Sequence, residues 1–231
     1  MSAGERWMGV RVRRLASTVA VAVAVAGCGS ASTARTTTTA TTTPPGATAA
    51  VKLWLEHLVA HDDTAAFNDL GPRSQQGIGD VDNYMRGSSR FGSVYSRFAP
   101  PSGTIAATVV IRADLAVALL RIPGEPPAAA AVPVRRVGAD WRVDPVLDVG
   151  SYSFQPNEGD SVSSQPIFTT QLDGPDVSAR VWFDDTEAVA ISATTFRPRS
   201  PLTVGWHVVT AVLLKGEDIV ARTVDLKVTS P

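Results

Sequence analysis

Residues 104–122 read TIAATVVIRADLAVALLRI, and this stretch decides how the first folded region is interpreted. Thr104–Ile111 is rich in β-branched residues, Ala113-Asp114 marks a turn, and Ala116–Ile122 follows as a second apolar run. Short runs of this composition, separated by turn residues, predict β-strands. Two further strands complete a predicted antiparallel meander, over Val132–Val137 and, after the tight turn Gly138-Ala139-Asp140, over Trp141–Val146.

Helical patterns precede the meander. In the stretch from Thr48 to His61, four apolar residues recur at i, i+3, i+4 and i+7: Val51, Trp54, Leu55 and Leu58. This spacing places them on one face of an amphipathic helix. Two further helices are predicted, one through Thr64–Leu70 with Asp62-Asp63 as its N-cap, and one over Val81–Phe98. Helices followed by an antiparallel sheet are typical of an α+β domain, here at 48–150.

After a hydrophilic break at Asn157–Asp160, within an expected linker at 151–163, the pattern changes to strands only. Polar turns separate five strand-like runs: Ile167–Leu172, Val177–Phe183, Ala188–Phe196, Trp206–Leu214 and Ile219–Val228. Short strands at regular spacing predict a small β-sandwich, which we expect at 164–231.

The first 47 residues have the composition of an export signal and a tether. Arginines at 11, 13 and 14 precede an apolar run from Leu15 to Ala26, and small residues lead from there to Cys28. A basic head, a short apolar stretch and small residues before a cut site form a secretory signal peptide. The apolar run has about a dozen residues, whereas a span of the bilayer needs roughly 20. A cleaved peptide with an incidental thiol and a single-pass anchor stay open as alternatives, and Met8 as an alternative start.

Val25-Ala26-Gly27-Cys28 resembles the lipobox of bacterial lipoproteins. That family diacylates the cysteine thiol, cleaves before the cysteine and acylates the new amino terminus. The resemblance implies a signal peptide at 1–27, recognition at Val25, Ala26 and Gly27, and a membrane partner held through lipid on Cys28. Because two or three acyl chains make attachment durable, the expected location is the extracytoplasmic side of the cell membrane. Residues 28–47 are then a flexible Thr/Pro-rich tether, with glycosylation of its hydroxyls left open.

Charge and cysteine content exclude several classes of protein. The full chain has 21 Lys and Arg against 22 Asp and Glu, and removing residues 1–27 leaves 17 against 21, a formal charge of −4. This balance argues against a nucleic-acid partner. With Cys28 as the single cysteine, the chain can form neither an internal disulfide nor a thiolate metal cluster.

Three stretches support two family resemblances. The opening helix Ala50–Leu55 and the closing hairpin Gly138–Asp144 resemble the nuclear-transport-factor-2-like (cystatin-like) superfamily, whose members form a cone of helices on a curved antiparallel sheet. Some of those proteins are isomerases, dehydratases or cyclases, and many are non-catalytic binding or spacer modules. Leu202–Val212 resembles bacterial immunoglobulin-like domains, which mostly act as spacers or docking modules. The implied fold class is an α+β cone followed by a small all-β immunoglobulin-like sandwich.

Candidate ligand residues lie on the predicted meander: Arg112, Arg121, Arg135 and Trp141. An arginine that faces the interior of a cone would favour an anionic ligand, although arginines on the outer face are the simpler interpretation. His57 and His61 have the i, i+4 spacing that can seat a metal, but a solvated or capping role is preferred. We therefore expect no metal, no cofactor and no assigned catalytic residue.

Three functional hypotheses follow. The chain has no Ser-x-x-Lys, Gly-x-Ser-x-Gly or Walker-type motif. The leading hypothesis is a non-catalytic, lipid-anchored envelope protein that binds a small ligand or another envelope protein. The alternatives are a small-molecule isomerase or hydrolase that uses the pocket of the cone, and a passive spacer for surface display.

Overall fold

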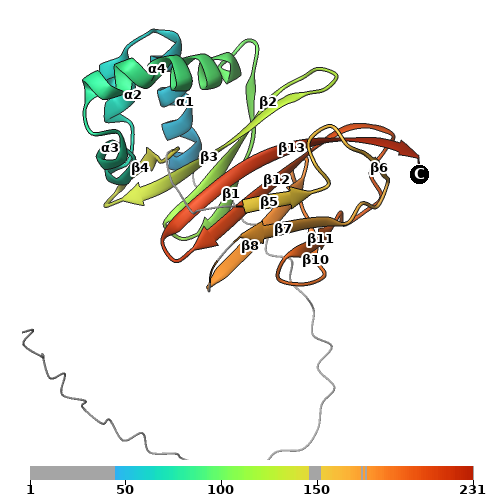
Figure 1. Ribbon diagram of the computed structural model, residues 1–231. Helices are drawn as coiled ribbons and strands as arrows, with labels where there is room; N and C mark the ends of the chain where they lie inside the picture. The colour runs from blue at the N-terminus through green and yellow to red at the C-terminus, as the bar shows by residue number, and fades with distance from the viewer. Residues whose placement is uncertain (1–44, 146–151, 173, 175, 231) are drawn as a thin grey trace, which may run out of the picture. The chain divides into compact units, whose positions relative to one another are not determined.

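The computed structural model describes residues 45–145, 152–172, 174 and 176–230. The predicted signal peptide, the lipidation site and most of the tether therefore lie outside the described residues. Four helices open the described part, α1 (Pro45–Val59), α2 (Asp63–Asn68), α3 (Pro72–Ile78) and α4 (Val81–Tyr95), and a 3₁₀ turn, η1 (Ser96–Phe98), follows them (Figure 1). Within this part of the chain, no helix is both long and apolar enough to cross a membrane.

Local sequence explains where these helices begin. The carboxylate of Asp62 accepts a hydrogen bond from the backbone N–H of Ala65 and caps α2. The helix α3 was not expected, because the sequence predicts no helix between Leu70 and Val81. Pro72 is instead the first residue of α3, a position where its missing N–H and its fixed φ suit a helix start.

The predicted meander is present as a sheet in the order β1-β2-β3-β4, here named the meander sheet. Its strands are β1 (Thr104–Arg112), β2 (Leu115–Ile122), β3 (Ala128–Val137) and β4 (Asp140–Val143). All neighbouring strands are antiparallel. Gly138, in the turn between β3 and β4, has φ +63°, a conformation that glycine adopts without steric cost.

Two more sheets follow in the chain. The central sheet has the order β6-β13-β12-β8-β9, and the outer sheet has the order β10-β11-β7-β5. The strands of the central sheet are β6 (Ser161–Ser163), β8 (Val177–Phe183), β9 (Thr186–Glu187), β12 (Gly205–Lys215) and β13 (Asp218–Ser230). Those of the outer sheet are β5 (Tyr152–Gln155), β7 (Phe168–Leu172), β10 (Val189–Ala190) and β11 (Thr195–Arg197).

The helices cover one face of the meander sheet (Figure 1). The core between them is filled by large side chains that have no exposed surface, among them Trp54, Tyr84, Phe98 and Leu120. Burial raises the pKa of the Tyr84 hydroxyl to about 12. The interior on this side of the sheet is therefore occupied by side chains.

The opposite face of the meander sheet packs against the central sheet. Leu115, Val117 and Leu119 of β2 form one apolar cluster with residues of the central sheet, Trp182, Val212, Ile219 and Ala221. The alternate residues of β2 point toward the helices, so every position from Leu115 to Leu120 is buried. A strand covered on both faces has a continuous apolar run in place of alternation, which explains the composition of β2.

The central sheet is also covered on both faces. Val209 and Leu226 lie on its far side in a cluster with Phe168 and Phe196 of the outer sheet. The rings of Phe168 and Phe183 meet edge to face at 6.4 Å between centroids. Helices, meander sheet, central sheet and outer sheet thus pack in succession, each on the next.

The expected fold class, an α+β cone followed by a separate immunoglobulin-like sandwich, is wrong. The protein is mostly β, in three sheets, with helices only in its N-terminal part. The physical reason is that the second face of the meander sheet is apolar and is buried against the central sheet. Two local predictions also need correction. The expected linker at 151–163 contains β5 and β6, and Ala188–Phe196 is divided between β10 and β11 instead of forming one strand.

Replacing Trp182 with Ala tests the packing of the meander sheet on the central sheet. The side chain is 2 % exposed, so we expect a loss of about 3–5 kcal/mol in the free energy of unfolding. Urea unfolding of the full-length chain, followed by far-ultraviolet circular dichroism and by fluorescence, should show a single transition that moves to lower denaturant for both probes. The matched control is Trp206→Ala, at a half-buried position, with an expected loss below about 1 kcal/mol. Separate transitions for helices and strands would contradict the shared packing.

Candidate functional site

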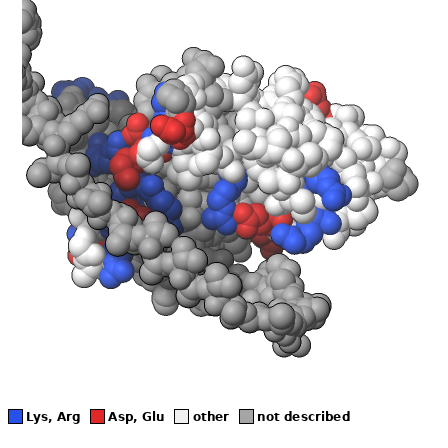
Figure 2. Space-filling view, turned by 90° about the horizontal axis from the view of Figure 1, so that it is seen from below, with Lys and Arg blue, Asp and Glu red and all other residues white. Residues whose placement is uncertain are grey.

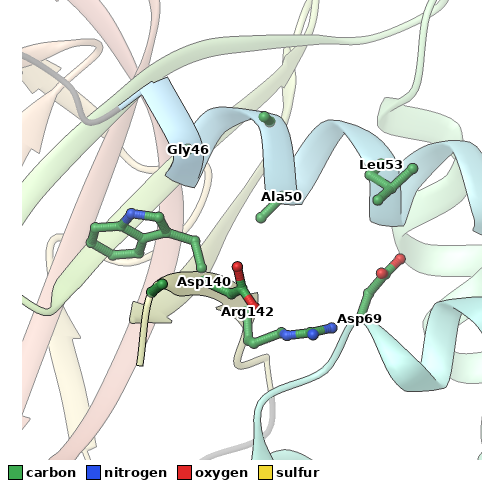
Figure 3. Close-up of a pocket in the computed structure, with 9 residues that line it drawn as sticks. Gly46, Ala50, Leu53, Asp69, Asp140 and Arg142 are labelled. Carbon is green, nitrogen blue, oxygen red and sulfur yellow. The ribbon is translucent and has the colours of Figure 1, made fainter. Parts of the chain in front are cut away.

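A groove of about 430 Å³ lies between the first half of α1 and the hairpin of β3 and β4. Its α1 side consists of small or apolar residues, Gly46, Ala49, Ala50 and Leu53. Its hairpin side consists of Ala139, Asp140, Trp141 and Arg142, and Asp69, the residue that follows α2, completes the lining. Figure 3 shows Gly46 at one end of the groove, with Leu53 and Asp69 at the other. A volume of this size fits a small ligand.

Backbone contacts hold the hairpin side of the groove in place. The N–H of Val143 donates to the carbonyl of Asp69, and the N–H of Gly71 donates to the carbonyl of Val143. The guanidinium of Arg142 donates through Nη1 to the carbonyl of Asn68 at 2.8 Å, and its side chain extends toward Asp69 (Figure 3). The segment after α2 is thus attached to β4, which brings Asp69 beside residues some seventy positions later in the chain.

The carboxylate of Asp69 has a second partner. Its Oδ2 lies 2.6 Å from Nδ1 of His57, and the two side chains are 15 % and 27 % exposed. His57 follows Leu53 by four residues on α1, and this spacing places both on the same face of the helix. Asp69, which lines this end of the groove, is therefore paired with a histidine that lies one helical turn beyond Leu53.

Gly46 and Trp141 determine the width of the other end. A Cβ atom at Gly46 would lie 2.8 Å from Cδ1 of the Trp141 indole, closer than real Cβ contacts. Any larger residue at position 46 would therefore displace the indole or the start of α1. The half-buried Trp141 is the one predicted ligand residue that lines this groove.

Two of the predicted arginines form ion pairs. Arg135 pairs through Nε with the buried Asp144 at 3.2 Å and through Nη1 with Glu217 at 3.2 Å. Arg112 contacts the same Glu217 carboxylate at 3.3 Å. Arg73 of α3 pairs with Asp218. Since Glu217 belongs to the turn between β12 and β13, this network attaches that turn to the meander sheet and to α3.

The third predicted arginine, Arg121, donates from Nη2 to the backbone carbonyl of Asp184 at 2.9 Å. Burial lowers the pKa of its guanidinium, and the carboxylates of Asp184 and Asp185 oppose that shift. The arrangement connects the meander sheet to the turn between β8 and β9. None of the three arginines is among the residues that line the groove.

A smaller hollow of about 180 Å³ lies at that same turn, lined by residues that include Asp185, Arg199 and Leu202. Beside it, Nδ1 of the buried His207 lies 2.8 Å from the Asp184 carboxylate, and Nε2 lies 2.8 Å from the carbonyl oxygen of Thr203. The Asp184 carboxylate also accepts the N–H of Val208. These contacts hold the turn and the loop before β12 together, so His207 has a structural role.

The predicted spacing of His57 and His61 does not produce a metal site. α1 ends at Val59, and His61 has φ +55° in the turn that follows, so the two rings do not share a helix face. In the described part of the chain, no group of three or more His, Cys, Asp or Glu side chains is placed to hold a metal ion.

Charged groups of both signs lie beside one another on the face seen in Figure 2, next to a wide area that carries neither sign. Independently of that view, the outer sheet has exposed uncharged polar residues, Ser153, Gln155 and Gln171. The groove also combines both signs of charge. Its lining has two carboxylates, those of Asp69 and Asp140, and the guanidinium of Arg142, and the imidazole of His57 lies beside Asp69.

Sequence reasoning missed Asp69, Asp140 and the small residues of α1. Asp140 was interpreted only as part of a turn, and Asp69 only as the end of a helical pattern. The available signal was the sequence Asp140-Trp141-Arg142, in which a carboxylate, an indole and a guanidinium follow directly on a tight turn. Nothing in the pattern of α1 indicates that its small residues face this hairpin.

Replacing Arg135 with Ala tests the ion-pair network. Asp144 is almost completely buried and, among the described residues, would keep the hydroxyl of Ser74, at 2.6 Å, as its remaining side-chain partner. Removing one partner of a buried pair leaves a charge without compensation, so we expect a loss of about 3 kcal/mol in the free energy of unfolding. The neighbouring Arg136 is exposed, and Arg136→Ala should change stability by no more than about 0.5 kcal/mol. Equal effects of the two variants in chemical denaturation would contradict the role given to Arg135.

Comparison with known proteins gives no family for this chain. No family model matches it. No curated protein matches it either. Among solved structures, an endo-β-1,4-mannanase from Thermotoga petrophila is 10 % identical with a TM-score of 0.29, over 36 % of this chain and 21 % of that one. A titin tandem of immunoglobulin domains is 9 % identical with a TM-score of 0.24, over 51 % of this chain and 63 % of that one. The chain thus spans less than two thirds of either structure, and likenesses this weak assign no fold or activity.

Proposed function

We propose that this protein is a lipid-anchored, extracytoplasmic binding protein that holds a small ligand in the groove between α1 and β4 without transforming it. The observation that carries the proposal is the convergence of Trp141, Asp140, Arg142 and Asp69 on one groove of about 430 Å³. Ligand sites typically combine an apolar wall with a few polar groups that fix orientation.

The packing of the helical region supports binding at this groove rather than in an internal pocket. The space between the helices and the meander sheet is occupied by Trp54, Phe98 and Leu120, none of which has exposed surface. An enzyme that encloses its substrate there would need that space empty. The groove lies instead at the edge of the meander sheet, where Leu53 is 46 % exposed and a ligand has access from solvent.

The extracytoplasmic, lipid-anchored location in this proposal rests on Val25-Ala26-Gly27-Cys28 and on the Thr-rich segment after it.

Replacing Cys28 with Ser removes the thiol that accepts the lipid. In the bacterial host, we expect the variant to lose incorporation of labelled palmitate and either to appear in the medium or to accumulate unprocessed. Ser30→Ala, two residues downstream, should be labelled and retained like the wild type. A Cys28→Ser protein that is processed normally and stays in the membrane would contradict the lipid anchor.

Binding at the groove is tested with the purified full-length chain in a detergent that has no sugar headgroup. Ligand-observed NMR with neutral saccharides, quaternary amines, dicarboxylates and blocked peptides should find at least one class that binds. Trp141→Ala should weaken that binding about tenfold or more, since it removes the aromatic wall. Trp206→Ala should leave it unchanged. If none of these classes binds, or if Trp141→Ala binds as the wild type does, the groove is not the site.

A second candidate function, acid–base catalysis in the same groove, rests on the His57–Asp69 pair. A carboxylate on Nδ1 orients an imidazole for proton transfer at its other nitrogen. The two functions differ in the fate of the bound ligand. Recovery of unchanged ligand after long incubation supports binding alone. Turnover that disappears in His57→Gln would favour catalysis.

A further inference from the structure

We infer that the groove between α1 and β4 takes a neutral, polyhydroxylated ligand of the size of a sugar ring. This inference rests on the proposed function, because it names the ligand class of the same site. It is carried by three features of the lining: its balance of charge, its combination of donors and acceptors, and its apolar wall.

Charge balance argues against an ionic ligand. Two carboxylates, Asp69 and Asp140, line the groove and repel an anion. The guanidinium of Arg142 lies with them and extends toward Asp69 (Figure 3). Because His57 already contacts one oxygen of Asp69, a cationic ligand would compete with it for that carboxylate and would be repelled by the guanidinium of Arg142.

A purely apolar ligand also fits poorly. It would remove water from Asp140 and Arg142 without replacing the lost hydrogen bonds, and unsatisfied charged groups are costly to bury. A ligand hydroxyl avoids this cost, because it donates to a carboxylate and accepts from a guanidinium. Several hydroxyls on one small frame can serve both kinds of group in the groove at once.

The rest of the lining suits the face of a ring. Ala49, Ala50 and Leu53 present methyl and isobutyl groups along α1, and the Trp141 indole lies across from them near Gly46. The C–H-bearing face of a pyranose or furanose can pack on such a wall while its hydroxyls point at the polar groups.

An extended peptide is disfavoured by the edge of the sheet. β4 is the last strand of the meander sheet, so a peptide would bind by adding a strand alongside it. The segment after α2 already occupies that edge, through a bridge between Leu70 and Val143 and two backbone hydrogen bonds at Val143. The space left is short and suits a compact ligand.

The test uses the full-length chain in the same sugar-free detergent, with isothermal titration calorimetry. The neutral probes are methyl glycosides of hexoses, N-acetylglucosamine and its trimer. The comparison probes are choline, citrate and a blocked neutral tripeptide. We expect at least one neutral saccharide to bind, with an affinity that stays within about twofold between low and high salt, since no net charge is transferred. The comparison probes should not bind at the groove.

Variants then locate the contacts. Asp140→Asn and Arg142→Gln should each weaken saccharide binding about tenfold or more, because each removes a charge-assisted hydrogen bond. Gly46→Ala should weaken it as well without altering any polar group, because the added Cβ would displace the indole or the start of α1 from the position that forms this end of the groove. Asp185→Asn and Arg199→Gln are the matched controls, since both residues are exposed and line the other hollow. Neither should change the affinity.

The outcomes separate this inference from the proposed function. If choline, citrate or the tripeptide binds in place of the saccharides and is lost in Trp141→Ala, the groove is a binding site but its ligand class is not the one inferred here. If saccharides bind equally well to the Asp140 and Arg142 variants, the inferred contacts are wrong. If no probe binds at all, the inference and the proposed function fail together.

Discussion

The contact between the meander sheet and the central sheet is the constraint on which the rest of this structure depends. Leu115, Val117 and Leu119 meet Trp182 and Val212 there, and all five side chains are almost completely buried. Full burial of a large aliphatic side chain contributes roughly 1.5–3 kcal/mol, so these residues make a large share of the stability of a domain of this size. Because both sheets need this contact, neither the meander sheet with its helices nor the central sheet with the outer sheet has a complete core without the other.

The charged network at the turn of β12 and β13 complements that contact. It connects the rim of the two packed sheets to α3 through Arg73, Arg135 and Glu217. Exposed ion pairs contribute little by themselves, whereas the Arg135–Asp144 pair is almost excluded from solvent and depends on good geometry. The apolar layer accounts for the attraction between the sheets, and the network restricts how the turn sits against α3.

Much of the secondary structure was predictable from sequence, but its assembly was not. The strands of the meander and the long strands of the central sheet have β-branched runs with clear turns between them. The run LAVALL at 115–120 also contained a signal for burial on both faces, because its apolar residues do not alternate with polar ones. The run was instead interpreted as a strand of a sheet that is covered by helices on one face and has no second sheet on the other. The short strands β5, β6, β9, β10 and β11 have two to four residues each, too few for any periodicity to show.

The candidate site was predicted less well than the strands. Arg112, Arg121 and Arg135 were candidate ligand residues, with positions on the outer face as the simpler interpretation, and all three make contacts within the protein. Trp141, the fourth candidate, belongs to the hairpin that carries the family resemblance, and it does line the groove. The residues opposite Trp141 come from α1 and from the segment after α2, and long-range pairings such as the bridge between Leu70 and Val143 attach that segment to the hairpin. Pairings between residues so distant in the chain leave no local pattern to detect.

The close approach of Gly46 to the Trp141 indole has a mechanical consequence. α1 begins at Pro45, so the polypeptide leading from the amino terminus joins the folded domain one residue before that contact. Tension applied along the polypeptide that precedes Pro45 would act first on the contact between Gly46 and the Trp141 indole. It would separate the first turn of α1 from the hairpin before any force reached the packed sheets. The α1 wall of the groove would therefore yield to such a load before the packed core does.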